Sequence, residues 1–198
     1  IEHNVGFPCV VKPLALSGSR GVIRCDDVRS LEVASARVAR IVGDEARHAG
    51  RASSPSIQML VESYLPGREV ALEGMLIDGE LHTLAIFDKP DPLEGPFFEE
   101  TYYVTPSRLD PATLAAVGNR TREAIAALGL REGPIHAELR VWRGDATVLE
   151  VAARTIGGDC ARLLRFGERT LEDLVLLHAV RRLSTPMIAL DQAGGVMM

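Results

Sequence analysis

The chain has 198 residues, of which 46% are hydrophobic and 25% charged, and its net charge is −5. This composition is typical of a globular enzyme, and the acidic excess argues against a general nucleic-acid binder. No run approaches the roughly 18 apolar residues of a membrane helix, so we expect no membrane association.

The cysteines and the first residues bear on the cellular location. Cys9, Cys25 and Cys160 lack the spacing of metal ligands, and their odd number disfavours a disulfide framework. No signal-peptide pattern follows Ile1. We therefore expect a cytoplasmic protein. Because the chain begins without Met, directly before a strand-like run, we also expect it to be a piece of a longer protein.

The first part of the chain predicts a small β-rich lobe, residues 1–65. Asp26 or Asp27 is placed to cap a helix whose apolar residues fall on one stripe. Pro66-Gly67 predicts the turn that ends this part. The predicted elements are, in order, strand 9–13, a small-residue loop at 15–21, strand 22–25, helix 28–49, a polar loop at 51–56 and strand 57–65.

The second part predicts an α+β lobe, residues 66–190. Asp78-Gly79 indicates a hairpin turn, and Asp110-Pro111 and Gly129 are suited to begin and end a helix. The predicted elements are strands 68–76 and 81–88, a proline-rich loop at 89–98, helix 111–128, a hairpin over 134–153 and a helix from 170 to about 183. We expect a disordered tail at 191–198. Without regular βαβ alternation, the fold class is α+β with mainly antiparallel sheets.

Two glutamates on the predicted 134–153 hairpin indicate a metal site. Glu138 and Glu150 stand among β-forming residues, where an unpaired buried carboxylate would cost several kcal/mol. A shared cation would explain both, since Mg²⁺ takes one or two carboxylates together with substrate phosphates. A surface salt bridge with Arg140 or Arg143 is the competing interpretation. His136 lies on the same strand face and is either a donor to a metal-bound carboxylate or a structural histidine.

Two other segments are suited to a nucleotide. Lys12 precedes a loop with Ser17, Gly18, Ser19 and Gly21, whose small residues would let backbone N–H groups approach phosphate oxygens. The alternative is an edge-strand lysine beside an ordinary loop, because the spacing is neither Walker nor Rossmann. The second segment contains Glu62, Tyr64 and Leu65, and then Glu69; it would present its backbone to an adenine edge and Glu69 to ribose hydroxyls. A solvated hairpin is the alternative there.

In their order along the chain, these segments resemble the ATP-grasp superfamily of carboxylate–amine ligases, and the wording Glu-Val-Ala-Ala-Arg resembles its amino-acid (dipeptide) ligase branch. Residues 10–21 resemble the phosphate-binding strand and lid, residues 61–69 the adenine hinge, and residues 136–140 with 149–158 the metal hairpin. Ala152 departs from the Asn that many members carry. The resemblance implies an ATP-grasp fold in which two α+β lobes enclose a nucleotide cleft, with further domains upstream and downstream.

The resemblance also implies a role for each matching residue. Lys12 would bind the α- and β-phosphates, and the 17–21 loop would close over the γ-phosphate. Glu62 and the backbone of Tyr64 and Leu65 would hold adenine, and Glu69 the ribose. Glu138 and Glu150 would bind Mg²⁺, or Mn²⁺ in its place. Arg154 would steady the transferred phosphoryl group or the carboxylate that receives it.

The implied activity is ATP-dependent ligation: a carboxylate is activated as an acyl phosphate, and an amine attacks it to form an amide or peptide bond. The implied partners are small-molecule acids and amines, and a homo-oligomer of the full-length protein is compatible with this reading. Two alternatives stay open. One is a carboxylase or a purine-biosynthetic enzyme of the same superfamily, and the other is a nucleotide-binding domain without turnover.

Overall fold

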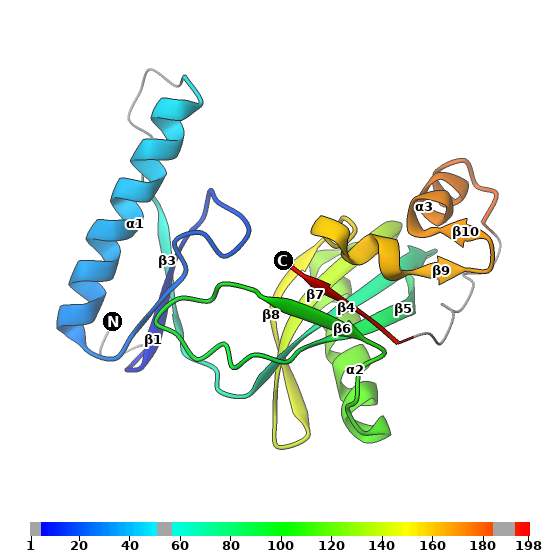
Figure 1. Cartoon of the computed structure of the whole chain (residues 1–198), viewed down its shortest axis with the longest axis horizontal. Coiled ribbons are helices and arrows are strands. Elements are labelled where there is room, and N and C mark those ends of the chain that lie inside the picture. Colours follow the sequence, from blue (N-terminus) through cyan, green and yellow to red (C-terminus); the bar gives the residue numbers. More distant parts are fainter. Residues whose placement is uncertain (1–4, 51–56, 184–192) are drawn as a thin grey trace. The chain divides into compact units, whose positions relative to one another are not determined.

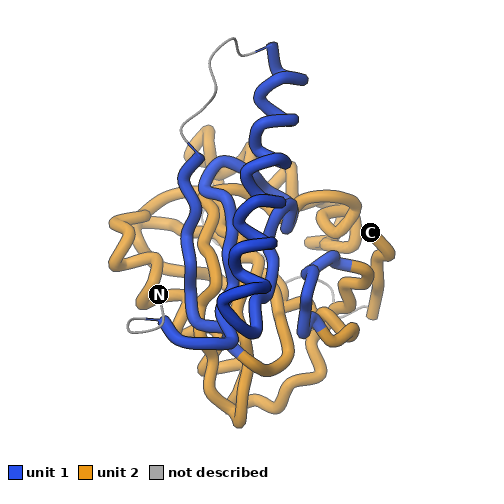
Figure 2. The backbone as a smooth tube through the Cα atoms, turned by 90° about the vertical axis from the view of Figure 1, so that its left-hand side faces the viewer, with its two compact units in different colours: residues 1–65, 93–100 blue, residues 66–92, 101–198 orange. Residues whose placement is uncertain are grey.

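The computed structural model describes residues 5–50, 57–183 and 193–198 (Figure 1). The chain divides into two compact units, Ile1–Leu65 with Leu93–Glu100, and Pro66–Pro92 with Thr101–Met198 (Figure 2). Every pairing between named strands is antiparallel over the described ranges, as the α+β prediction requires. No helix in those ranges has the length and apolar character to cross a membrane.

Unit 1 is a three-stranded sheet packed against one helix. β1 (Cys9–Pro13) lies between β2 (Ile23–Cys25) and β3 (Met59–Ser63), and α1 (Val28–His48) follows β2. Asp27 caps α1 in a capping box with Ser30, which satisfies backbone N–H groups at the helix start. The apolar residues of β1, β2 and α1 form its core: Cys9, Val11, Ile23, Cys25, Leu31, Ala34, Val38 and Val42.

Unit 2 is built on a six-stranded sheet with the order β11-β6-β5-β4-β7-β8. Its strands are β4 (Arg68–Ile77), β5 (Glu80–Lys89), β6 (Tyr102–Thr105), β7 (Gly133–Trp142), β8 (Asp145–Ala152) and β11 (Gly194–Met197). α2 (Pro111–Leu128) follows β6. A 3₁₀ helix η1 (Gly158–Leu163), the short strands β9 (Arg165–Phe166) and β10 (Arg169–Thr170), and α3 (Leu171–Ala179) follow β8.

The two faces of this sheet have different neighbours. Val70 and Leu72 of β4 pack in one core with Val117 and Ile125 of α2. Ala71, on the opposite face because side chains alternate along a strand, packs in a second core with η1, β9 and α3. Charged residues of β4 and β7 share the face of Ala71. One face of the sheet is therefore apolar and covered by α2, and the opposite face carries the charged side chains of β4 and β7.

The chain division corrects one expectation. Residues 93–100 belong with unit 1, although we assigned them to the second lobe. The reason is Arg24: its backbone N–H donates to the Pro96 carbonyl at 2.9 Å and its guanidinium to the Glu94 carbonyl at 2.8 Å. Ile23 also pairs with Phe97 in an isolated bridge. Partners this far apart in sequence leave no local signal.

The C-terminal expectations also need correction. The predicted disordered tail is wrong for residues 194–197, because β11 pairs with β6, Gly194 opposite Thr105 and Met197 opposite Tyr102. A glycine-rich segment has low intrinsic strand propensity, so its order depends on this distant partner. α3 ends at Ala179 rather than near residue 183. The predicted loop at 51–56 and the segment 184–192 lie outside the described residues.

Candidate functional site

The hairpin of β7 and β8 brings the two predicted metal ligands together. The strands meet at Arg143-Gly144, both with positive φ, and Glu138 is the direct cross-strand partner of Glu150. Directly opposed residues project from the same face of a sheet. Their carboxylate oxygens and one ring nitrogen of His136 all lie within 4.8 Å of one another. The two carboxylates thus project to one side of the sheet, as a shared cation requires.

The donor set fits a divalent cation. Glu138 is half-buried and Glu150 exposed, so the group of three is open on one side. Mg²⁺ prefers hard oxygen ligands and keeps several positions for waters or phosphate oxygens, which suits two carboxylates at an open surface. Ala152, the direct partner of His136, offers no side-chain oxygen there. This hairpin therefore offers two candidate protein ligands, Glu138 and Glu150.

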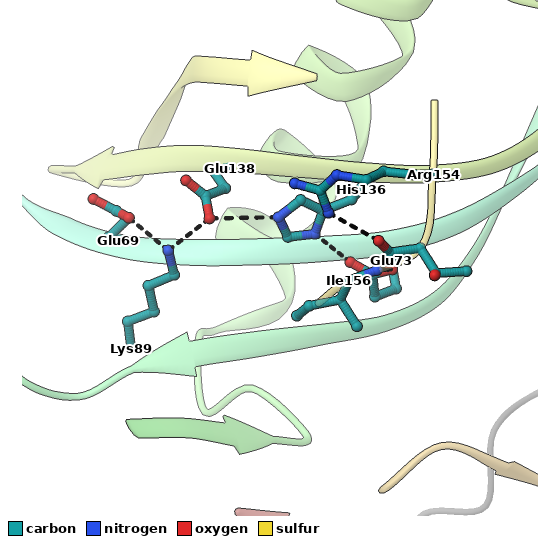
Figure 3. A network of polar contacts seen from close by, with 8 residues as sticks. Glu69, Glu73, Lys89, His136, Glu138, Arg154 and Ile156 are labelled. Atoms are coloured by element: carbon teal, nitrogen blue, oxygen red, sulfur yellow. Dashed lines mark hydrogen bonds and ion pairs between the residues drawn. The ribbon is translucent and has the colours of Figure 1, made fainter. Parts of the chain in front are cut away.

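A continuous row of charged side chains extends from Glu138 along the same sheet face (Figure 3). Lys89 Nζ lies 2.8 Å from Glu138 Oε1 and 2.7 Å from Glu69 Oε1. On the other side, His136 Nε2 lies 3.4 Å from Glu138 Oε1, and His136 Nδ1 bonds Glu73 Oε1. β4, β5 and β7 are adjacent, which places these side chains in line.

The charged side chains of this row are buried, so each of them needs a partner of opposite charge. Lys89 is 4% exposed, Glu69 7% and Glu73 1%. Arg140 closes the row, with its guanidinium 3.1 Å from Glu69 Oε2 and 2.8 Å from the Gly67 carbonyl. Removing one member of a buried pair leaves a buried charge without its partner and typically costs about 3–5 kcal/mol. The row is therefore a fixed polar scaffold under the candidate metal ligands.

The row also fixes protonation states. Burial opposes charge on His136, but the hydrogen bonds that its ring donates to Glu138 and Glu73 outweigh burial and raise the pKa of His136 to about 9. Burial would raise the pKa of Glu138, yet His136 and Lys89 lower it to about 2. At neutral pH an imidazolium therefore faces a carboxylate. In that protonation state His136 donates to Glu138 and offers no lone pair to a metal.

The predicted phosphate residues lie in unit 1. Lys12 of β1 forms an ion pair with Glu62 of the neighbouring β3, with Nζ and Oε2 2.5 Å apart. The structure thus brings together two residues assigned from separate motifs. In the loop, Gly18, Ser19 and Gly21 all have positive φ. A Cβ at Gly18 would meet nothing within 4 Å, so this part of the loop is open.

The predicted adenine segment is partly engaged within the protein. The Tyr64 N–H donates to the Pro8 carbonyl at 3.0 Å, and the Arg24 guanidinium lies 4.3 Å from the centre of the Tyr64 ring. The Tyr64 N–H is therefore bonded to Pro8 within the protein, and the adenine role of the Tyr64 backbone stays a prediction. Leu65 is half-buried. The ribose role of Glu69 stays a prediction, and both of its oxygens already have cationic partners.

Arg154 lies just beyond β8 in an exposed position, and its Nη1 donates to the Thr155 carbonyl at 2.9 Å. Two residues later, the Ile156 N–H donates to Glu73 Oε2 at 2.9 Å. Ile156 itself is buried in the core shared with η1 and α3. The segment that carries Arg154 is thus anchored to the polar row through its backbone.

Sequence reasoning missed most of the scaffold. Nothing in the sequence separates Glu73 and Lys89 from solvated surface charges, and the competing interpretation placed Arg140 in a surface salt bridge with the hairpin glutamates. The structure pairs Arg140 with Glu69, its direct cross-strand partner. Glu69 and Glu73 were the available signal, because acidic residues four positions apart on a mostly apolar strand share one face. That signal does not say which cation each acid meets.

Residues 5–162 match the family model described as an ATP-grasp domain. Alanine–anticapsin ligase of Bacillus subtilis is 27% identical over 168 residues, which cover 78% of this chain and 34% of that protein. The crystal structure of the L-amino acid ligase from Bacillus licheniformis has 32% identity and a TM-score of 0.78, covering 97% of this chain and 46% of that one.

A more distant structure shows the same fold. The biotin carboxylase domain of the 2-oxoglutarate carboxylase of Hydrogenobacter thermophilus, solved with ADP, magnesium ADP and bicarbonate, is 18% identical with a TM-score of 0.68, covering 94% of this chain and 39% of that chain. This chain thus spans about a third to a half of the length of these relatives. The family match, the antiparallel fold and the carboxylate hairpin agree: the chain belongs to the ATP-grasp domain family.

Proposed function

We propose that the protein containing this chain is an ATP- and Mg²⁺-dependent ligase that joins two amino acids or similar small molecules through an amide bond. The observation that carries the proposal is the direct pairing of Glu138 with Glu150, with His136 beside them, in a chain of the ATP-grasp family. The likeness to the Bacillus licheniformis ligase supports amino acids as the substrate class.

The proposed chemistry has two steps. A carboxylate oxygen of the first substrate attacks the γ-phosphorus of ATP; the bond to the β,γ-bridging oxygen breaks, and ADP and an acyl phosphate form. The amine of the second substrate then attacks the acyl carbon, inorganic phosphate leaves, and the amine loses a proton. No enzyme nucleophile is needed, because phosphoryl transfer depends mainly on positioning and charge neutralisation.

The roles of the chain's own residues follow from charge and exposure. Glu138 and Glu150 would hold Mg²⁺, with Mn²⁺ as a substitute, and a bound cation would neutralise charge on the triphosphate. Lys12 and the 17–21 loop would hold phosphate oxygens, and Glu62 with the Leu65 backbone the adenine. Exposed Arg154 would offer its guanidinium to the transferred phosphoryl group or to the accepting carboxylate.

We extend the proposal to the cellular location and the partners of the protein. We infer a cytoplasmic enzyme whose partners are small molecules rather than nucleic acid or membranes. The net charge of −5 and the odd number of scattered cysteines support this assignment.

The test is product formation by the full-length protein. We expect ATP, Mg²⁺ and pairs of amino acids to give ADP and a dipeptide in equal amounts, measured by coupled spectrophotometry and mass spectrometry. Glu150→Gln should reduce the rate to less than a tenth of the wild-type rate, because one carboxylate ligand is lost. Glu168→Gln, at an exposed position between β9 and β10, is the matched control and should keep full activity.

Three outcomes would overturn the proposal. ADP formation that depends on bicarbonate rather than on an amine would indicate a carboxylase. ATP binding without ADP formation across the panel of acids and amines would indicate a non-catalytic nucleotide-binding domain. A Glu150→Gln enzyme that keeps more than a tenth of the rate would remove this residue from the metal site.

A further inference from the structure

Glu73 is a buried acid for which the proposed reaction supplies no role. It lies on β4, is 1% exposed, and faces the same side of the sheet as the candidate metal ligands. Its two oxygens bind different elements: Oε1 bonds Nδ1 of His136 on β7, and Oε2 accepts the Ile156 N–H at 2.9 Å. Burial raises the pKa of Glu73, and these two hydrogen bonds offset part of the cost of burying the carboxylate.

Each bond leads to a group of the proposed site. The His136 ring, held at Nδ1, places Nε2 3.4 Å from Glu138 Oε1. The Ile156 backbone, held at its N–H, fixes the segment that begins two residues earlier with Arg154. Figure 3 shows the side chains of Glu73, His136, Glu138 and Arg154 gathered on one face. The Glu73 carboxylate therefore contacts two groups. One is the His136 ring beside the proposed metal ligand Glu138, and the other is the Ile156 N–H in the segment that carries Arg154.

We propose, on the basis of the function proposed above, that Glu73 is a positioning residue that fixes the position of Glu138 relative to Arg154. It acts through His136 and the Ile156 backbone and touches no substrate atom. A carboxylate with two separated oxygens suits this task, because it accepts from both donors at once. An amide in its place has one acceptor oxygen, so one of the two donors would face an NH₂ group.

The alternative is that Glu73 only stabilises the fold. A purely structural residue would lower the melting temperature on substitution without a selective effect on metal binding or turnover. Outer partners of metal ligands behave differently, since their mutation typically costs about 10–100-fold in metal affinity or activity. Metal affinity therefore separates the two interpretations independently of catalysis.

The experiment compares Glu73→Gln and Glu73→Asp with wild type in the full-length protein. Mn²⁺ binding is followed by electron paramagnetic resonance with a non-hydrolysable ATP analogue, and turnover by ADP formation. We expect both variants to weaken Mn²⁺ binding about tenfold or more and to lower kcat by about 10–100-fold, with the KM for ATP within about threefold. Aspartate keeps the charge but is one methylene too short to reach both donors.

Thr121→Val is the matched control. Thr121 is 0% exposed on α2, at the opposite face of the sheet, and its hydroxyl donates to the Val117 carbonyl at 2.9 Å. It should keep wild-type Mn²⁺ affinity and kcat, while its change in melting temperature measures the general effect of losing a buried polar group.

Several results would overturn the inference. The first is that the Glu73 variants match Thr121→Val in Mn²⁺ affinity and kcat, and the second is that Glu73→Asp alone recovers wild-type values of both. The third is that neither Glu73 variant folds. The fourth is that the wild-type protein does not bind Mn²⁺. A wild type that binds Mn²⁺ but forms no ADP would defeat the proposed function alone, and the Mn²⁺ comparison would still decide the role of Glu73.

Discussion

Gly67 illustrates how a single residue constrains the chain beside the candidate site. Its φ is +112°, and a Cβ there would lie 2.2 Å from the Val141 carbonyl oxygen and 2.8 Å from its carbon. Both atoms belong to the backbone of β7, so they cannot move aside as a flexible side chain would. The Gly67 carbonyl also accepts the bond from Arg140. Glycine is required at this position by conformation and by space together.

We therefore expect Gly67→Ala to lower the free energy of unfolding by about 2–4 kcal/mol, because backbone strain and a steric clash add. Urea denaturation followed by circular dichroism measures the change. The control is Gly129→Ala at the C-terminal cap of α2, where φ is +70° and a Cβ meets nothing within 4 Å. Strain alone should cost about 1–2 kcal/mol there. Equal losses in the two variants would contradict the role assigned to Val141.

The charged residues show how far sequence reasoning reaches at this scale. Glu138 and Glu150 were identifiable because a short polar turn forces their strands to pair, and pairing places them opposite each other. The partners of Glu69 and Glu73 were not identifiable. Lys89 and His136 come from strands whose register with β4 depends on the whole sheet, and a shift by one residue would reverse every face.

Helix α2 shows the same contrast at the scale of an element. Both of its ends follow from local chemistry: Asp110 accepts from the N–H groups of Ala112 and Thr113, and Gly129 adopts the left-handed cap conformation. Its role as the cover of one sheet face depends on Val117 and Ile125 meeting apolar side chains of β4 and β7. A stable α2 therefore supports the sheet on which the polar row is built.

We expect Asp110→Ala to lower the melting temperature by about 2–4 °C at pH 7, because two helix N–H groups lose their acceptor. Hydrogen bonds from Thr113 lower the pKa of Asp110 in the folded state. Its stabilising effect is therefore complete above the unfolded pKa of about 4 and is lost as the pH falls through the lower, folded pKa.

Thermal scans at several pH values check both parts of this prediction: the difference between variant and wild type should shrink below about pH 4. Glu123→Ala on the same helix is the control. Its exposed pair with Arg120 at 3.0 Å should contribute little, so the melting temperature should change by less than about 1 °C. A difference for Asp110→Ala that persists unchanged in acid would contradict the capping interpretation.

At the scale of the whole molecule, the residues proposed to hold one nucleotide are divided between the two units. Lys12 and Glu62 belong to unit 1, whereas Glu138 and Glu150 belong to unit 2. The polypeptide passes from unit 1 to unit 2 at Leu65–Pro66, and residues 93–100 return to unit 1. A ligand that binds the folded state alone lowers its free energy, so protection in each unit tests the residues assigned to that unit.

We expect Mg²⁺ and a non-hydrolysable ATP analogue to slow backbone amide hydrogen exchange in β1 and in β7 together, followed by mass spectrometry. Lys12→Ala should reduce this protection in both strands, because nucleotide affinity falls. Arg29→Ala, which removes an exposed cation of α1, should leave the protection unchanged. Protection restricted to one unit would contradict the role proposed for the residues of the other unit.

The sequence alone determined the features that depend on neighbouring residues: most helices and strands, the caps of α2, and the hairpin that opposes Glu138 and Glu150. It also indicated the ATP-grasp family, because the motifs occur in the family's order, and the family match confirms this. Only the tertiary structure decided the rest: the order of β11, the attachment of residues 93–100 and the partners of Glu73. These features depend on contacts between residues far apart in the chain, whose register is set by the packing of the whole sheet.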